Sequence, residues 1–300
     1  LAALGQQSLS ADAWELCLVD NGSTPSLQPK DLGANPGNRH LVTEPRAGLL
    51  WARLCGLHAT HGEYVVFIDD DTVPDRNFLQ AAVNFMSARP MVATAGGIIS
   101  GRFAGPKPEW IESALWCLAL RDNGAEPREW SLGEGSFPSW TPIGAGLLTR
   151  RAALEPGYVT HIENNWQAIE TNSWIGQGAG GVEDKDLVLH CLRAGWSTGY
   201  VPDMKLTHII PTSRLERSYI ERLIPNLERI WMRTLHAHAL DEHPPIHPFT
   251  LWLRQIKAWV VMRAWSSPAA RFSWLSSCGR LRGLADNYRN PACYPAPKKP

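Results

Sequence analysis

The chain has 300 residues, of which 44% are hydrophobic and 19% charged, and its 29 basic and 29 acidic side chains cancel to a formal net charge of zero. This length and apolar content suit one large domain, or one domain with an extension, and exclude a wholly disordered chain. A neutral total argues against a uniformly basic nucleic-acid-binding protein. Tryptophan is unusually frequent, with 14 residues.

The cysteines and the apolar runs indicate the compartment. The six cysteines form no C-x-x-C pair, which favours free thiols over a disulfide framework or a zinc site. No apolar run reaches the roughly 18 residues of a membrane-spanning helix, and no signal-peptide pattern opens the chain. We therefore expect a cytoplasmic protein that can rest peripherally on the inner face of the cell membrane.

Short apolar runs alternate with helix-spaced apolar residues in the first half of the chain. The pattern predicts a strand, a helix, a second strand and a second helix over residues 14–19, 49–59, 64–68 and 78–88. This order indicates an α/β fold with a mostly parallel sheet flanked by helices. Ligands of such sheets bind beyond the carboxyl ends of the strands, where the acidic turns at Asp20 and Asp69 lie.

The second half changes in composition near residue 212. Before that point we expect an irregular, Trp-containing stretch over 101–142 around a short helix at 110–120. A helix over 184–194 and a strand over 199–210 should follow. Residues 1–213 hold 15 basic and 23 acidic side chains, a balance of −8, whereas residues 214–300 hold 14 and 6, a balance of +8. We therefore predict a main domain over 1–212 and a helical, basic, Trp-rich extension over 213–300.

Asp69, Asp70 and Asp71 form the strongest single motif. In extended backbone Asp69 and Asp71 point the same way, and Asp70 points elsewhere. Adjacent carboxylates repel unless a cation or hydrogen-bond donors compensate them. Mn²⁺ or Mg²⁺ supplies that compensation and brings phosphate oxygens with it. The alternative is a solvated acidic turn in which Asp71 caps the next segment of the chain.

A second acidic motif opens the predicted helix at residue 184. Glu183 and Asp184 follow a glycine-rich stretch at 176–181, and acids in a first helical turn ordinarily complement the helix dipole. The functional alternative is a general base that takes a proton from a substrate hydroxyl. Asp20 can accept a hydrogen bond from a nucleotide or stabilise its own turn, and His208 is either a ligand or a core histidine.

Taken together, these motifs resemble glycosyltransferase family 2, including its bacterial members, whose enzymes adopt the GT-A fold. The resemblance extends to about residue 215 and rests on the order and spacing of the segments at 18–24, 48–56, 62–71, 144–151, 181–187 and 200–208. It implies a sheet whose first strand would precede Leu1, so the family's opening strand is missing from this sequence.

The resemblance also implies roles for individual residues. Asp184 would be the catalytic base, with Glu183 supporting the acceptor site. Asp71 and His208 would hold the Mn²⁺ or Mg²⁺ ion on the diphosphate. The nucleotide-sugar would be bound by Asp20, Arg53, Asp69 and Asp70.

Tryptophans mark two further regions. Trp140 lies beside the turn of Gly144 and Gly146, and we expect these three residues to bind the acceptor, a saccharide or a lipid-linked molecule; packing of a loop-rich region is the alternative. In the tail, Trp252, Ile256 and Trp259 share one side of a predicted helix that also carries basic residues. Residues 250–290 can therefore contact an anionic membrane surface or pack on the main domain.

These features predict a metal-dependent, inverting glycosyltransferase that acts on a nucleotide-diphosphate sugar. Two other functions use the same residues: a GT-A-like protein that binds nucleotide or lipid without turnover, and a nucleotidyltransferase. The basic tail carries no recognised nucleic-acid-binding motif, so we expect no nucleic-acid partner.

Overall fold

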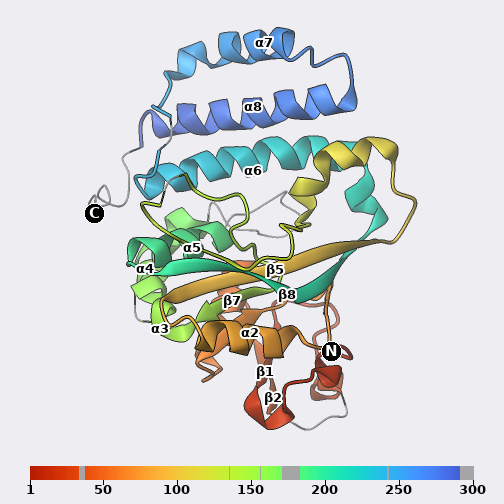
Figure 1. Ribbon diagram of the computed structural model, residues 1–300. Helices are drawn as coiled ribbons and strands as arrows, with labels where there is room; N and C mark the ends of the chain where they lie inside the picture. Colours follow the sequence, from red (N-terminus) through yellow and green to blue (C-terminus); the bar gives the residue numbers. More distant parts are fainter. Residues whose placement is uncertain (34–37, 135, 156, 171–182, 242, 291–300) are drawn as a thin grey trace. The chain divides into compact units, whose positions relative to one another are not determined.

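The computed structural model describes residues 1–33, 38–134, 136–155, 157–170, 183–241 and 243–290 (Figure 1). Its contacts divide the chain into two compact units. The first unit contains described residues within 1–101, 121–170 and 183–208, and the second contains those within 102–120 and 209–290. The domain boundary expected near residue 212 stays a prediction.

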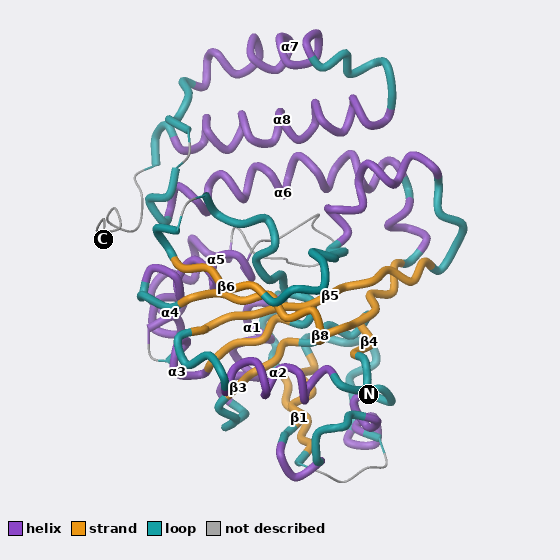
Figure 2. The backbone as a smooth tube through the Cα atoms, viewed as in Figure 1, coloured by secondary structure: helices purple, strands orange, loops and turns teal. Residues whose placement is uncertain are grey.

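Two sheets form the centre of the first unit (Figure 2). The smaller sheet pairs β1 (Leu16–Asp20) with β2 (Arg39–Thr43) in parallel. The larger sheet has the order β3-β7-β5-β8-β4, and β6 pairs with β8 outside this path. Its strands are β3 (Tyr64–Phe67), β4 (Thr72–Pro74), β5 (Val92–Phe103), β6 (Arg128–Ser131), β7 (Leu147–Arg150) and β8 (Ser197–Ile210).

Strand directions in the larger sheet are mixed. Strand β7 is antiparallel to both β3 and β5, so β3 and β5 share one direction. Ser197 N donates to Met91 O at one end of the β5–β8 pair and Ala104 N donates to Ile210 O at the other, which makes β8 parallel to β5. Strands β4 and β6 oppose β8. Strands β3, β5 and β8 therefore run in one direction, and β4, β6 and β7 run antiparallel to them.

Helices of the first unit cover the sheets with apolar side chains. They are α1 (Leu49–His58), α2 (Phe78–Ser87), α3 (Arg151–Leu154), α4 (Gly157–Glu170) and α5 (Glu183–Arg193), with short 3-10 turns η1 (Leu4–Gln6), η2 (Ala11–Ala13) and η3 (Pro29–Leu32). In α1, the buried residues Leu50, Leu54 and Leu57 recur at helical spacing. In α2, Phe85 lies so close to β8 that a Cβ at Gly199 would contact its ring at 2.6 Å.

The second unit is a helical layer around its own core. It contains η4 (Glu109–Leu118), η5 (Thr212–Leu215), α6 (Arg217–Ala237), η6 (Pro248–Thr250), α7 (Leu251–Val261) and α8 (Pro268–Asn287). Within this unit α8 lies between α6 and α7 (Figure 1). Two glycines of α8 allow its close approach to α6, because a Cβ at Gly283 would lie 2.5 Å from Met232 Cβ and one at Gly279 would overlap the carbonyl of Pro225.

The α/β class with flanking helices and a helical C-terminal region is confirmed. The helices predicted over 49–59, 78–88 and 184–194 match α1, α2 and α5 to within a residue or two at each end. The predicted helix at 110–120 is the 3-10 segment η4. Strands β2, β4, β5, β6 and β7 were not predicted.

Candidate functional site

Asp20 closes β1 and holds the turn after this strand. Its buried carboxylate accepts hydrogen bonds from Ser23 N at 2.9 Å and Leu27 N at 3.0 Å. These hydrogen bonds, from Ser23 first, lower the pKa of Asp20. The neighbouring Asn21 donates to the carbonyls of Glu44 and Arg46. Asp20 therefore has the turn-stabilising role that the sequence left open, and contact with a nucleotide stays a prediction.

The three aspartates after β3 differ in exposure. Asp70 is exposed, whereas Asp69 and Asp71 are half-buried. The Asp69 carbonyl accepts from Thr72 N at 3.1 Å and Thr72 Oγ1 at 2.7 Å, which closes the turn into β4. Burial raises the pKa of the Asp69 carboxyl; Arg53 opposes this shift, and the Asp71 carboxylate adds to it. Ionised Asp69 therefore needs a cation beside it.

His208 meets Asp71 across the β4–β8 ladder. Thr72 pairs with His208 in the register, and His208 Nε2 lies 3.2 Å from Asp71 Oδ2. A carboxylate oxygen and an imidazole nitrogen are suitable donors for Mn²⁺. No group of three or more His, Cys, Asp or Glu side chains that could hold a metal occurs in the described part of the chain. A metal at Asp71 and His208 would therefore need phosphate oxygens as further ligands, as is common for nucleotide-bound Mg²⁺.

Arg53 links the strand-end aspartates to the second acidic motif. Its side chain on α1 is only 9% exposed, with Nη2 at 3.9 Å from Asp69 Oδ1 and Nη1 at 3.6 Å from Glu183 Oε1. Its Nε is buried and has no hydrogen-bond partner among the described residues. A Cβ at Gly144 would overlap Arg53 Nη2, so glycine is needed there for the guanidinium to lie against the backbone.

Glu183 is the most strongly perturbed carboxyl of the site. Burial raises its pKa to about 7, Arg53 opposes the shift, and Asp184 adds to it. Its Oε2 atom is buried without a hydrogen-bond partner within the described ranges. Tyr158 Oη donates to its carbonyl at 3.5 Å. Such a carboxyl is half protonated near neutral pH, which is typical of functional sites.

Asp184 fixes the loop before β7. Its Oδ2 accepts from Gly144 N at 2.7 Å, and its Oδ1 accepts from Lys185 N at 2.8 Å. Lys185 Nζ donates to Thr141 Oγ1 at 2.6 Å and to the carbonyls of Thr141 and Pro142. Burial lowers the pKa of Lys185 to about 8, and the Asp184 carboxylate opposes this shift. The first turn of α5 therefore does more than complement the helix dipole.

Two residues near these acids were not predicted. Arg121, which bridges to Ile99 of β5, is half-buried. Burial lowers its pKa, and the Asp184 carboxylate opposes this shift. Lys185 lies within a motif that the sequence singled out for its acids alone. Arg121 carries no sequence signal, because it stands in an irregular stretch without periodicity.

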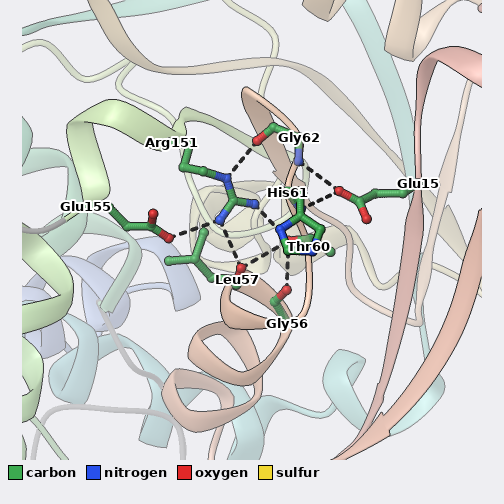
Figure 3. A network of polar contacts seen from close by, with 8 residues as sticks. All are labelled: Glu15, Gly56, Leu57, Thr60, His61, Gly62, Arg151 and Glu155. Atoms are coloured by element: carbon green, nitrogen blue, oxygen red, sulfur yellow. Dashed lines mark hydrogen bonds and ion pairs between the residues drawn. The ribbon is translucent and has the colours of Figure 1, made fainter.

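A polar network holds α1 and therefore Arg53 in place (Figure 3). Arg151 donates to the carbonyls of Gly62 and Leu57 and to Thr60 Oγ1, over 2.8–3.0 Å. Glu15, just before β1, accepts from Gly62 N at 2.8 Å. The carboxyl end of α1 is thus tied to the segments that begin β1, β3 and α3.

The three residues predicted to bind the acceptor, Trp140, Gly144 and Gly146, lie close in sequence to the residues that contact Asp184 and Lys185. Trp140 is half-buried just before the Thr141–Pro142 carbonyls that bind Lys185. Gly146 has a φ of 74°, and a Cβ there would overlap Leu206 of β8. Gly146 is thus required by packing, and acceptor binding by these residues stays a prediction. Residues 176–181, the whole of the glycine-rich stretch, lie outside the described residues.

Part of the chain is similar to a known family of glycosyltransferases. The family model of glycosyl transferase family 2 matches residues 1–138. This match covers 138 of the 300 residues of the chain. An N-acetylglucosaminyltransferase of Azorhizobium caulinodans is 22% identical over 161 residues, which are 53% of this chain and 37% of that protein. The chain thus spans little more than a third of the length of this relative.

Solved structures of S. aureus TarS are also similar. TarS 1–349 in complex with UDP has 14% sequence identity and a TM-score of 0.47, and the match covers 96% of this chain and 86% of that one. TarS 1–349 in complex with UDP-GlcNAc has 13% identity and a TM-score of 0.46 over the same shares. The family 2 resemblance read from the sequence is confirmed, and the roles of individual residues stay predictions.

Proposed function

We propose that the chain transfers a sugar from a nucleotide-diphosphate sugar to an acceptor hydroxyl with inversion at the anomeric carbon. One observation carries this proposal. Buried Arg53 joins Asp69, in the acidic turn after β3, to Glu183, which stands next to Asp184 on α5. A pure binding protein would have no use for a second carboxylate site beside the first. The match of residues 1–138 to the model of glycosyl transferase family 2 supports the same assignment.

In the proposed reaction Asp184 takes the proton of the acceptor hydroxyl. The acceptor oxygen then attacks the anomeric carbon, and the bond from that carbon to the diphosphate breaks. The electron pair of this bond leaves with the nucleoside diphosphate. Gly144 N and Lys185 N hold the two oxygens of Asp184 in place, so that the base is oriented before the substrate arrives.

Donor binding is assigned to the strand-end residues. Asp20, Asp69 and Asp70 would contact the nucleoside, and Arg53 would orient Asp69. Asp71 and His208 would hold Mn²⁺ or Mg²⁺, whose chemistry is to neutralise charge on the leaving diphosphate. An N-acetylglucosamine donor is the first to test, because the matched Azorhizobium protein carries that name.

The acceptor is proposed to be a saccharide or a lipid-linked molecule that enters beside Trp140, Gly144 and Gly146. An acceptor at a lipid surface would place the protein on the inner face of the cell membrane, through residues 250–290. Sugar transfer to the acceptor and binding to a membrane can be measured in separate experiments, because binding to a lipid surface needs no turnover.

The test is release of nucleoside diphosphate from a panel of sugar nucleotides, with and without Mn²⁺, together with sugar incorporation into candidate acceptors. We expect release to depend on metal and to be lost in both Asp71→Ala and Asp184→Asn. Asp203→Asn, which removes an exposed carboxylate from β8, is the matched control.

Other outcomes would assign a different function. Nucleotide binding without release would indicate a non-catalytic binding protein. Release of pyrophosphate when a nucleoside triphosphate and a sugar phosphate are supplied instead would indicate a nucleotidyltransferase. Full turnover in both aspartate variants would overturn the proposal.

A further inference from the structure

Helix α7 presents its large apolar side chains to solvent. Trp252 is 59% exposed, Ile256 53% and Val260 52%. These residues are spaced by four, so they form one stripe along the helix. Phe249 and Leu253 are also exposed at the start of this stripe. No residue of α7 is buried.

The opposite side of α7 faces α8 and is less apolar. Leu251, Gln255 and Ala258 are half-buried there. Trp274 of α8 donates its indole N–H to the Gln255 carbonyl at 3.0 Å. The Gln255 side-chain nitrogen is buried without a hydrogen-bond partner among the described residues. A helix selected only for packing on α8 would carry the reverse pattern, with its apolar stripe inward.

The charged side chains of residues 243–285, the segment that contains α7, are all positive. Residues 243–285 contain six Lys or Arg and no Asp or Glu. On α8, Arg271 and Arg280 are engaged by acids of α6, Glu221 and Glu228. The cations of the α7 segment, which are Arg254, Lys257 and Arg263, are exposed and form no ion pair with any described residue.

Arg263, one of these cations, has a strained backbone conformation in the turn after α7. Arg263 has a φ of 49°, in the left-handed region where glycine is preferred. Its N–H donates to Val260 O at 3.1 Å, and Ala264 N donates to Trp259 O at 3.0 Å. This is the hydrogen-bond pattern of a Schellman helix end. Trp265 comes directly after Ala264 and is also exposed.

We propose that this surface, defined as the outer stripe of α7 with Arg254, Lys257 and Arg263, docks on an anionic lipid bilayer. Trp, Ile and Val beside Lys and Arg are the residues of helices that lie in the membrane interface. No helix in the described ranges is long and apolar enough to span a bilayer, so the contact is one of lying on the membrane. The proposal specifies the surface for the membrane contact of residues 250–290 named above, and it does not rest on sugar transfer.

A second copy of the chain is a poorer occupant of the same surface. A two-fold interface would bring the same patch of each chain together. The cations of one copy would then face those of the other, with no acid in residues 243–285 to compensate them.

The experiment is co-sedimentation of the full chain with vesicles of phosphatidylcholine alone and of phosphatidylcholine with phosphatidylglycerol, over a range of NaCl concentration. We expect binding only to the anionic vesicles and weaker binding as salt rises. Ile256→Ser with Val260→Ser should weaken it about tenfold or more, because apolar area is lost from the interface. Arg254→Gln with Lys257→Gln should weaken it about 25-fold, at about fivefold per cation.

The matched control variants remove an exposed apolar side chain or two exposed cations from the first unit, outside the α7 surface. Met91→Ser removes a residue that is 57% exposed in the first unit, and Lys30→Gln with Lys205→Gln removes two exposed cations there; both should bind like the wild type. Equal binding by the α7 variants and their controls would overturn the proposal, as would no binding to anionic vesicles. A dimer in sedimentation velocity that the α7 variants convert to monomer would assign the surface to a second copy instead.

Discussion

Gly144 N donates a hydrogen bond to Asp184 Oδ2 over 2.7 Å, so the loop beside the expected acceptor site is fixed by the carboxylate proposed as the base. Asp184→Asn preserves this contact, because the amide oxygen can still accept from Gly144. We expect the nucleotide-sugar affinity to stay within about twofold, because the base lies outside the donor contacts, while turnover falls about 10²–10⁴-fold. Isothermal titration and single-turnover assays separate the two, and an equal loss in both would contradict the role as base.

The two glycines of that loop should respond differently to alanine. In Gly144→Ala the new Cβ meets only the end of the flexible Arg53 side chain. The chain should therefore fold with little change in melting temperature, while Arg53 is displaced from Asp69 and nucleotide-sugar affinity falls about tenfold or more, the usual cost of one charge-assisted contact.

Gly146→Ala is the contrasting variant. Here φ is 74° and the Cβ would overlap Leu206 of β8. We expect destabilisation by roughly 2–3 kcal/mol from strain and overpacking, measured by thermal denaturation. Equal destabilisation by Gly144→Ala and Gly146→Ala would contradict this distinction between the two glycines.

Glu183 should make stability depend on pH. Its pKa is raised by burial from an ordinary 4.5 to about 7. Between these values the folded protein keeps a proton that the unfolded chain has lost, so the free energy of unfolding falls as pH rises toward about 7 and is level above it. Glu183→Gln removes this titration, so the variant should gain stability relative to the wild type between pH 5 and 7.5, by at most about 3 kcal/mol.

The measurement is the difference in melting temperature between Glu183→Gln and wild type at each pH. Glu126→Gln, at an exposed position, should show no such trend. A difference that is constant with pH would mean that Glu183 is ionised throughout.

The sequence predicted the elements whose patterns are local and missed those whose reasons lie in distant contacts. Helix α1 follows from the spacing of Leu50, Leu54 and Leu57. Strand β5, which contains Gly96 and Gly97, was not predicted. In the structure Gly97 lies against the Met204 carbonyl of β8, where a Cβ has no room. That requirement comes from a strand about a hundred residues away.

In the candidate site too, the sequence predicted residues with local motifs and missed features that depend on contacts between distant parts of the chain. Asp71 and His208 were each predicted from their own motifs, but their 3.2 Å contact depends on the register of β4 and β8. Arg121 was missed altogether because only the fold brings it near Asp184. On α7 the sequence indicated an amphipathic helix, and only the structure shows which side faces α8.

His208 and Asp71 should together determine affinity for Mn²⁺ in the presence of a nucleoside diphosphate. Electron paramagnetic resonance of free Mn²⁺ measures this without turnover. We expect His208→Gln and Asp71→Asn each to weaken Mn²⁺ binding by about tenfold or more, since two protein donors leave little to replace one that is lost. His58→Gln, at an exposed histidine of α1, is the control. Unchanged binding in both variants would place the metal elsewhere or remove it from the mechanism.

Arg263→Gly should separate folding stability from membrane affinity. The φ of 49° at this position costs an arginine about 1 kcal/mol that glycine does not lose, so the variant should melt about 2 °C higher. The same change removes a cation from the α7 surface, and affinity for anionic vesicles should fall about fivefold. Arg263→Lys keeps both the charge and the strain and should match the wild type in both measurements. If Arg263→Gly raised stability and left vesicle affinity unchanged, Arg263 would lie outside the docking surface.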